Sequence, residues 1–199
     1  MTNRSYRTHK TYTPRHTSGE RARLITPHGG YRKLKSYQTA EIIYDLTVEF
    51  TKRYIKSFKL KEQMDGAARS GKQNIAEGCQ VSGTSKKSEL KLISVARGSL
   101  EELLQDCEDF LRQRNLRLWA KDSAQARAVR ELAYRKNRSY TTYKTYTTSP
   151  ETAANCLVCL IHQANYLLDQ QLKSLEKDFL EKGGFTEKLY KARTQFRKI

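Results

Sequence analysis

One long apolar stripe between residues 86 and 116 constrains the fold more than any other feature of the sequence. Its members recur at intervals of three and four residues, which places them on one face of a helix of about eight turns. They are Leu90, Ile93, Ala96, Leu100, Leu103, Leu104, Cys107 and Leu111. Other helices have to cover a stripe of this length, so the sequence predicts a helical bundle.

The segment before this stripe, residues 63–81, predicts a second helix whose contact face is built from small residues. Ala67, Gly71, Asn74 and Gly78 recur every three to four positions. Each glycine inside a helix costs roughly 1 kcal/mol relative to alanine, so this face is expected to allow close approach of a neighbouring backbone. A hydroxyl in residues 82–85 can cap the following helix. Residues 63–116 are therefore predicted to form a helical hairpin.

Two further long helices supply the cover that the hairpin needs. The first spans about residues 36–58. The last begins at Ser149-Pro150-Glu151, where a hydroxyl N-cap, a proline at the first position and an early acid coincide. Its apolar stripe continues to Phe179 and stops at the glycine pair 183–184. We therefore predict an all-α protein, an antiparallel up-down-up-down four-helix bundle with a basic N-terminal tail and a C-terminal helical extension.

The expected domain organisation follows from these elements. Residues 1–30 form a basic flexible tail, residues 31–182 form the bundle, and residues 183–199 form a basic C-terminal helix that Thr186 can cap. An insertion at about 120–148, with a short helix over residues 123–136, precedes the last bundle helix.

Charge is the outlying property of the composition. The 199 residues carry 38 Lys and Arg against 21 Asp and Glu, a formal net charge of +17. Such a field attracts polyanions, with nucleic acid first and an anionic membrane second. The apolar runs are too short to span a membrane and the N-terminus has no signal-peptide core, so we expect a cytoplasmic protein. The four cysteines are expected to be reduced thiols.

The N-terminal 30 residues hold six basic residues and a single acid, Glu20. Tyrosines and histidines lie between the cations, a mixture that can stack on bases while it neutralises phosphates. A solvated leader without a specific ligand is an equally weighted alternative.

An 11-residue tract occurs twice. Residues 137–147 repeat residues 3–13 with two differences, Thr141 for Arg7 and Tyr143 for His9. Two copies are too few for a solenoid. We interpret the tract as a duplicated low-complexity segment whose second copy is a mobile loop. Its Tyr and Thr content also permits a strand, through which the copies would pair or bind the same partner.

A possible metal site, Cys156, Cys159 and His162, has three-residue spacing. On a continuous helix each step of three residues turns back by about 60°, which separates the ligands, so buried thiols are expected instead. Asn74, Glu77 and Arg97 fall near apolar faces and are expected to form hydrogen bonds that fix the helix register.

An acidic patch on the third helix has two interpretations. Paired carboxylates can perform acid–base work or hold divalent cations, but a solvated face, or ion pairs with Arg97 or a neighbouring subunit, is favoured. The chain has no phosphate loop, nucleophile elbow or dinucleotide fingerprint, so we expect no enzyme, cofactor or metal. The patch consists of Glu101, Glu102, Asp106, Glu108 and Asp109.

Three short motifs in the hairpin carry a resemblance to a known family. They are Ala68-Arg-Ser-Gly71 followed by Asn74-Ile-Ala-Glu-Gly78, then Ser88-Glu-Leu90, then Ala96-Arg-Gly-Ser-Leu-Glu-Glu-Leu103. The chain resembles the small bacterial four-helix-bundle proteins that include those encoded in intervening sequences of 23S ribosomal RNA genes. The accessory variability proteins of diversity-generating retroelements are relatives of that family.

The resemblance covers residues 31–116, and residues 153–193 look like the variant with a C-terminal suffix. It implies a barrel-shaped homopentamer, and it implies basic surfaces that bind RNA and a reverse transcriptase.

We therefore expect a non-catalytic, oligomeric nucleic-acid-binding scaffold or accessory protein, with RNA favoured over DNA and binding largely through phosphates. The alternative is a protein-binding adaptor whose basic surface docks an acidic partner. The residues expected to contact nucleic acid are Arg4, Arg7, Arg32, Lys33, Lys52, Arg53, Lys56, Lys72, Lys86, Lys87, Arg112 and Arg114.

Overall fold

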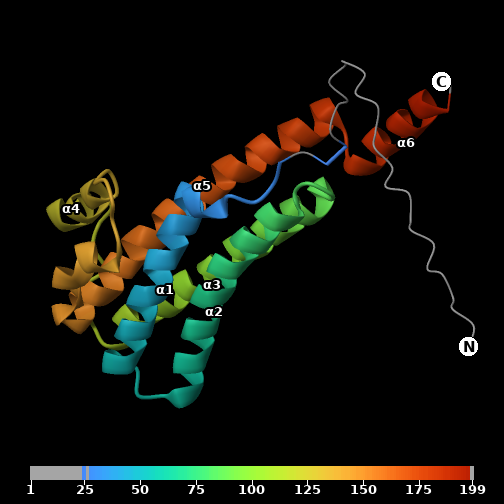
Figure 1. Cartoon of the computed structure of the whole chain (residues 1–199). Coiled ribbons are helices and arrows are strands. Elements are labelled where there is room, and N and C mark those ends of the chain that lie inside the picture. The colour runs from blue at the N-terminus through green and yellow to red at the C-terminus, as the bar shows by residue number, and fades with distance from the viewer. Residues whose placement is uncertain (1–23, 26, 198–199) are drawn as a thin grey trace, which may run out of the picture.

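Four antiparallel helices form the body of the protein. The computed structural model describes residues 24–25 and 27–197. Each of the four helices packs on the next in chain order, and the last one closes the ring against the first (Figure 1). The predicted all-α, up-down-up-down four-helix bundle is confirmed. The bundle helices are α1 (Lys35–Tyr54), α2 (Phe58–Val81), α3 (Lys86–Gln113) and α5 (Pro150–Lys182).

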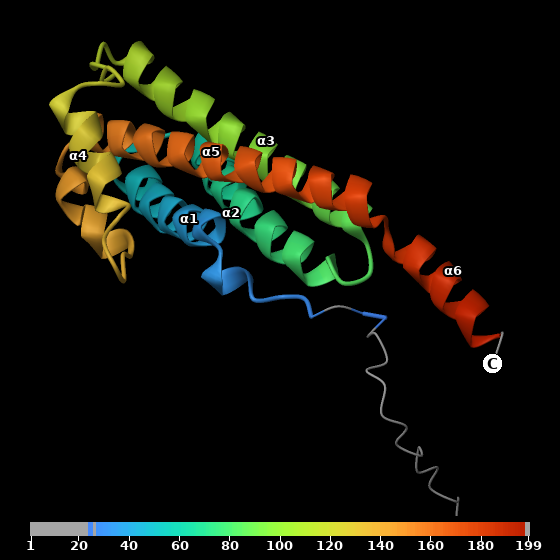
Figure 2. The same cartoon turned by 90° about the horizontal axis from the view of Figure 1, so that it is seen from above.

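Four shorter elements complete the described chain. The 3-10 helix η1 leads into α1, while α4 and η2 lie between α3 and α5 and pack on the first half of α5. Figure 2 shows α6 continuing away from the bundle beyond the end of α5. Their bounds are η1 (Tyr31–Lys33), α4 (Ala124–Leu132), η2 (Tyr140–Thr148) and α6 (Phe185–Phe196).

The apolar stripe of α3 lies in the core, as its spacing predicted. Seven of its eight members are buried, and Leu90 alone is half-buried. Ser85 caps the helix, because its hydroxyl accepts a hydrogen bond from the Ser88 amide at 3.1 Å. The N-cap of α5 is also where the sequence placed it, since the Ser149 hydroxyl accepts from the Thr152 amide at 3.2 Å.

The small residues of α2 allow the close approach to α3 that the sequence indicated. A Cβ atom on Gly71 would lie 2.7 Å from Cδ2 of Leu100, and one on Gly78 would lie 3.4 Å from the Glu89 carbonyl oxygen. Leu100 is fully buried, and because side chains in a core are closely packed, a shift of its side chain would disturb its neighbours. The backbones of α2 and α3 therefore approach each other closely at the positions where α2 has glycine.

Replacing Gly71 by alanine should destabilise the protein, although alanine favours helix. The added methyl group would overpack the Leu100 site, a change that costs about 1–3 kcal/mol. Gly66→Ala in the same helix is the matched control, because no atom lies within 4 Å of the Cβ it would add. The free energies of unfolding of the two variants, measured in urea, should differ by about 1–3 kcal/mol with Gly71→Ala the less stable. Equal stabilities would contradict the close packing.

Four predicted helix boundaries are wrong. The first helix ends at Tyr54 rather than near residue 58, and α2 begins at Phe58 rather than near residue 63. Ile55 is extended and buried, and Ser57 provides an N-cap, so the chain turns at residues 55–57, inside the segment that the periodicity assigned to the first helix.

The short helix of the insertion stops at Leu132, four residues early. Thr186 is not an N-cap, because α6 begins at Phe185 after an extended Gly184.

The second copy of the repeated tract forms η2 and belongs to the core. Tyr143 is fully buried, and the Thr147 carbonyl accepts a hydrogen bond from the Tyr54 hydroxyl at 2.8 Å. Arg138 donates to the Thr39 hydroxyl at 2.8 Å. These contacts hold the tract against α1, so both the strand alternative and the loose-loop interpretation are wrong for this copy. The first copy, residues 3–13, lies outside the described residues.

The insertion changes the surroundings of α5. Residues 153–161 are all buried, which is the pattern of a helix covered on every side. The four-helix bundle covers one side, and α4 and η2 cover the other (Figure 2). Further along, Leu172 and Leu175 are half-buried and Phe179 is exposed, so the last part of the predicted stripe is uncovered in the described chain. Among residues 24–25 and 27–197, no helix has the length and apolar character that a membrane span requires.

Candidate nucleic-acid interface

Three exposed lysines surround the turn between α1 and α2. Lys52 lies in the last turn of α1, Lys56 in the link, and Lys59 in the first turn of α2. The turn is fixed by Ile55, whose side chain is buried and whose amide donates to the Thr51 carbonyl at 3.1 Å. The backbone that carries these lysines therefore has a fixed conformation.

The end of α3 adds arginines at the same end of the bundle (Figure 1). The Arg114 guanidinium lies over the Phe110 ring, 4.0 Å from its centroid, and Phe110 in turn contacts Phe50 of α1 with ring centroids 4.8 Å apart. Arg112 pairs with Asp109 at 2.6 Å, and both side chains are largely exposed. We call this surface the connection end; its exposed basic residues are Lys52, Lys56, Lys59, Arg112, Arg114 and Arg117.

Arg53, although it lies beside Lys52, is occupied within the fold. Its guanidinium pairs with Glu49 at 2.5 Å and donates to the Thr147 carbonyl at 3.2 Å. It therefore anchors η2 to α1, a role that the sequence did not indicate.

The structure does not bring all the predicted site residues together. Arg32, Lys33, Lys86 and Lys87 lie at the opposite end of the bundle, and Lys86 is about 39 Å along α3 from Arg112 at 1.5 Å per residue. Lys72 lies between the two ends, with its ammonium 4.3 Å from the Tyr44 ring centroid. Arg4 and Arg7 lie outside the described residues.

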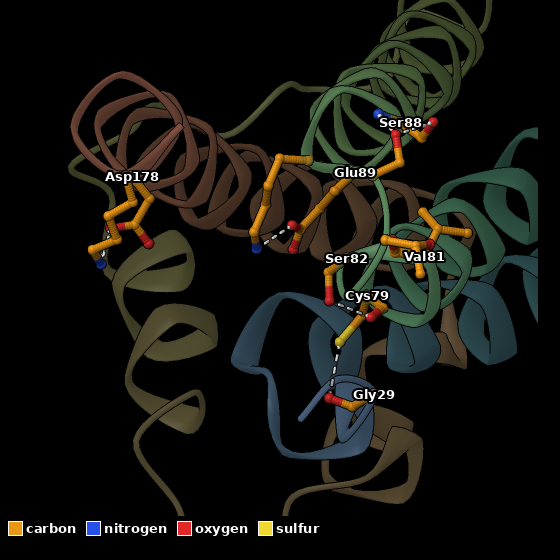
Figure 3. Close-up of polar contacts among 11 residues, drawn as sticks. Gly29, Cys79, Val81, Ser82, Ser88, Glu89 and Asp178 are labelled. Carbon is orange, nitrogen blue, oxygen red and sulfur yellow. Dashed lines mark hydrogen bonds and ion pairs between the residues drawn. The ribbon is translucent and has the colours of Figure 1, made fainter. Parts of the chain in front are cut away.

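The opposite end has more internal polar contacts. Figure 3 shows the turn between α2 and α3, where the Cys79 thiol donates to the Gly29 carbonyl at 3.1 Å and Lys86 pairs with Glu89 at 2.8 Å. The Gly29 amide also donates to the Cys79 carbonyl at 3.2 Å. The Glu89 side chain is nearly buried, and its pairing leaves Lys86 less available to an external anion. The segment that follows the basic tail is thus attached at this end.

The acidic patch of α3 is divided between internal contacts and solvent. Glu101 pairs with Arg97 at 2.6 Å and accepts from the Asn165 amide at 3.1 Å. Burial raises the pKa of the Asp106 carboxyl, and the nearby Asp109 and Glu102 carboxylates raise it further. In the part of the chain that the structure describes, no three His, Cys, Asp or Glu side chains are grouped so as to hold a metal ion.

Cys156, Cys159 and His162 diverge around α5 as the helix geometry predicted. Both thiols are buried, and burial raises the pKa of each, whereas His162 is exposed. The two cysteines thus belong to the core.

The three polar residues singled out near apolar faces have different roles. Asn74 donates to the Ser70 carbonyl at 2.9 Å, and Arg97 pairs with Glu101 and, at 3.3 Å, with Asp169 of α5. Both residues make internal hydrogen bonds, but the Asn74 bonds to Ser70 lie within α2, so only the Arg97 contact with Asp169 joins two bundle helices as the prediction requires. Glu77 is exposed, so its expected place beside the apolar face is wrong.

Comparison with known protein families gives a match for the helical hairpin and for the helix before it. The model of the 23S rRNA-intervening sequence protein family matches residues 33–121, which include α1, α2 and α3. Neither the curated proteins nor the solved structures gave a match. The match ends before the insertion helix and α5. Over residues 33–121, therefore, this chain is similar to the 23S rRNA-intervening sequence protein family.

Proposed function

We propose that this protein is a non-catalytic RNA-binding scaffold or accessory protein that holds RNA phosphates at its connection end. The observation that carries the proposal is the exposure of Lys52, Lys56 and Lys59 and their lack of ion pairs within the described residues. Their charge is therefore available to a ligand rather than used by the fold.

The arginines of the connection end extend this surface. Arg112 pairs with Asp109 between side chains that are 71% and 53% exposed, and an exposed pair of this kind contributes at most about 1 kcal/mol. Exchange of Asp109 for a phosphate therefore costs little. Arg114 keeps its charge while it stacks on Phe110, so it can meet a phosphate as well.

RNA is favoured over other polyanions because of the family. The name of the family that residues 33–121 match refers to an intervening sequence of 23S rRNA, and this chain carries a net charge of +17. By resemblance we extend the proposal to a homo-oligomer, with a pentamer as the expected ring and a reverse transcriptase as a partner. The tail at residues 1–30 and the basic helix at residues 183–199 are proposed as additional cationic arms of the bundle.

A salt titration of binding distinguishes this function from a protein-binding adaptor. The probes are a 12-nucleotide single-stranded RNA, a 12-base-pair DNA duplex and polyglutamate. If about six cations of the connection end contact phosphates, log K for the RNA should fall against log salt with a slope of about −4, and the RNA should bind more tightly than polyglutamate. Equal affinity for RNA and polyglutamate would favour the adaptor.

A further inference from the structure

Phe58 is an exposed aromatic ring at the connection end. It is the first residue of α2 and 73% exposed, whereas Phe50 and Phe110 at the same end are buried. Single exposed apolar residues are common on protein surfaces. The position of this ring, one residue before Lys59 and two after Lys56, is what distinguishes it, since both lysines are exposed.

The backbone that carries Phe58 is held on both sides. The Ser57 hydroxyl accepts from the Leu60 amide at 3.3 Å, and the Lys61 amide donates to the Ser57 carbonyl at 3.0 Å. One turn before the link, the Thr51 hydroxyl donates to the Asp65 carboxylate at 2.7 Å and joins α1 to α2. The ring is therefore presented by two fixed helix ends, so little ordering is needed when a flat ligand binds.

An aromatic ring between cations has the composition of a stacking site for nucleic-acid bases. Every base has a π-face, and stacking on an aromatic side chain is largely independent of sequence. In a duplex both faces of an internal base are covered by neighbouring base pairs, so an internal base can stack on a protein ring only when it is unpaired.

We propose that Phe58 stacks on an unpaired base of single-stranded RNA while Lys56 and Lys59 hold the flanking phosphates. This inference rests on the proposed function, because it assumes that RNA binds at the connection end. It adds a preference that phosphate contacts alone do not give, for unpaired over paired RNA. The sequence did not indicate Phe58, because the residue was expected to lie at the end of the first helix.

The test compares Phe58→Ala with Phe58→Trp, and uses Tyr134→Ala as a matched control. Tyr134 is 88% exposed and follows Ala133, whose carbonyl accepts from Arg138. Arg138 also donates to Thr39, which lies about 20 Å along α1 from Lys52 at 1.5 Å per residue. Three probes carry the same fluorophore: a 12-nucleotide unstructured RNA, a 12-nucleotide abasic strand with the same phosphates, and a 12-base-pair RNA duplex. Because the ring is exposed, its removal is expected to leave the thermal unfolding of the protein unchanged.

Phe58→Ala should weaken binding of the 12-nucleotide RNA about 5- to 150-fold, the effect of losing one stacked base. Binding of the abasic strand and the duplex should change less than twofold, and the salt slope should stay the same. Phe58→Trp should bind the RNA about as tightly as the wild-type protein does, and Tyr134→Ala should not change the RNA affinity.

Equal losses on all three probes, or no loss on the RNA, would overturn the stacking assignment and leave the phosphate interface in place. A change of oligomeric state in Phe58→Ala, seen by light scattering, would also overturn it, because the ring would then be a contact between protein chains. Failure of the wild-type protein to bind any RNA would instead contradict the proposed function itself.

Discussion

Reversing the charges of Lys52, Lys56 and Lys59 together should lower the affinity for a 12-nucleotide RNA by about a hundredfold or more at 0.1 M salt. Each lost phosphate contact removes about 0.7 from the salt slope for a single strand, so three contacts account for about 2. A slope difference of that size corresponds to about a hundredfold between 1 M and 0.1 M salt. Fluorescence anisotropy at several salt concentrations measures both quantities.

The matched control reverses Arg32, Lys33 and Lys87 at the opposite end of the bundle. It removes the same net charge, so it subtracts the general effect of charge on RNA attraction. We expect it to weaken binding about tenfold or less and to leave the salt slope nearly unchanged. A loss as large as that of the first variant would place the RNA elsewhere or spread it over the whole surface. Circular dichroism should show the same helix content in both variants, because all six side chains are exposed.

Replacing Tyr143 by alanine should destabilise the protein by about 3–5 kcal/mol, the usual cost of removing a large aromatic side chain from a core. Tyr143 is fully buried in η2, although it lies in a Tyr- and Thr-rich tract of low complexity. Urea denaturation of the full chain, followed by circular dichroism, measures the change. A loss of less than about 0.5 kcal/mol would be typical of a surface loop and would contradict the packing of η2.

Tyr143→Phe is the companion variant, and we expect that, unlike Tyr143→Ala, it does not lower the stability of the protein. Within the described residues the buried Tyr143 hydroxyl makes no hydrogen bond of good geometry; burial raises the pKa of Tyr143, and the nearby Arg138 guanidinium opposes this rise. An unpartnered buried hydroxyl costs about 1–3 kcal/mol, so its removal should leave stability unchanged or increase it. The pair of variants thus separates the contribution of the ring to the free energy of unfolding from that of the hydroxyl.

The bundle was predictable because its helices repeat one signal many times. The stripe of α3 has eight members, and the cap at Ser149 combines three independent features, so each prediction tolerates local exceptions such as Leu90. The turn at residues 55–57 was missed because Ile55 and Phe58 are both apolar. Sequence periodicity cannot show that the first is buried in the turn while the second faces solvent.

The candidate site was predictable in kind but not in place. A surplus of cations follows directly from composition, whereas the grouping of Lys52 with Arg112 depends on antiparallel packing that brings the end of α1 to the end of α3. Arg53 shows the same limit. Its ion pair with Glu49 and its hydrogen bond to the Thr147 carbonyl join α1 to η2, and nothing in the local sequence indicated that a repeated tract would pack there.

The enclosure of residues 153–161 by η2 and α4 limits how copies of this protein can assemble. In a bare four-helix bundle, the outer side of every helix is open to neighbouring subunits. Here the chain itself occupies that side along the first third of α5. Along this stretch a neighbouring protomer would therefore meet the surfaces of α4 and η2 rather than α5 itself.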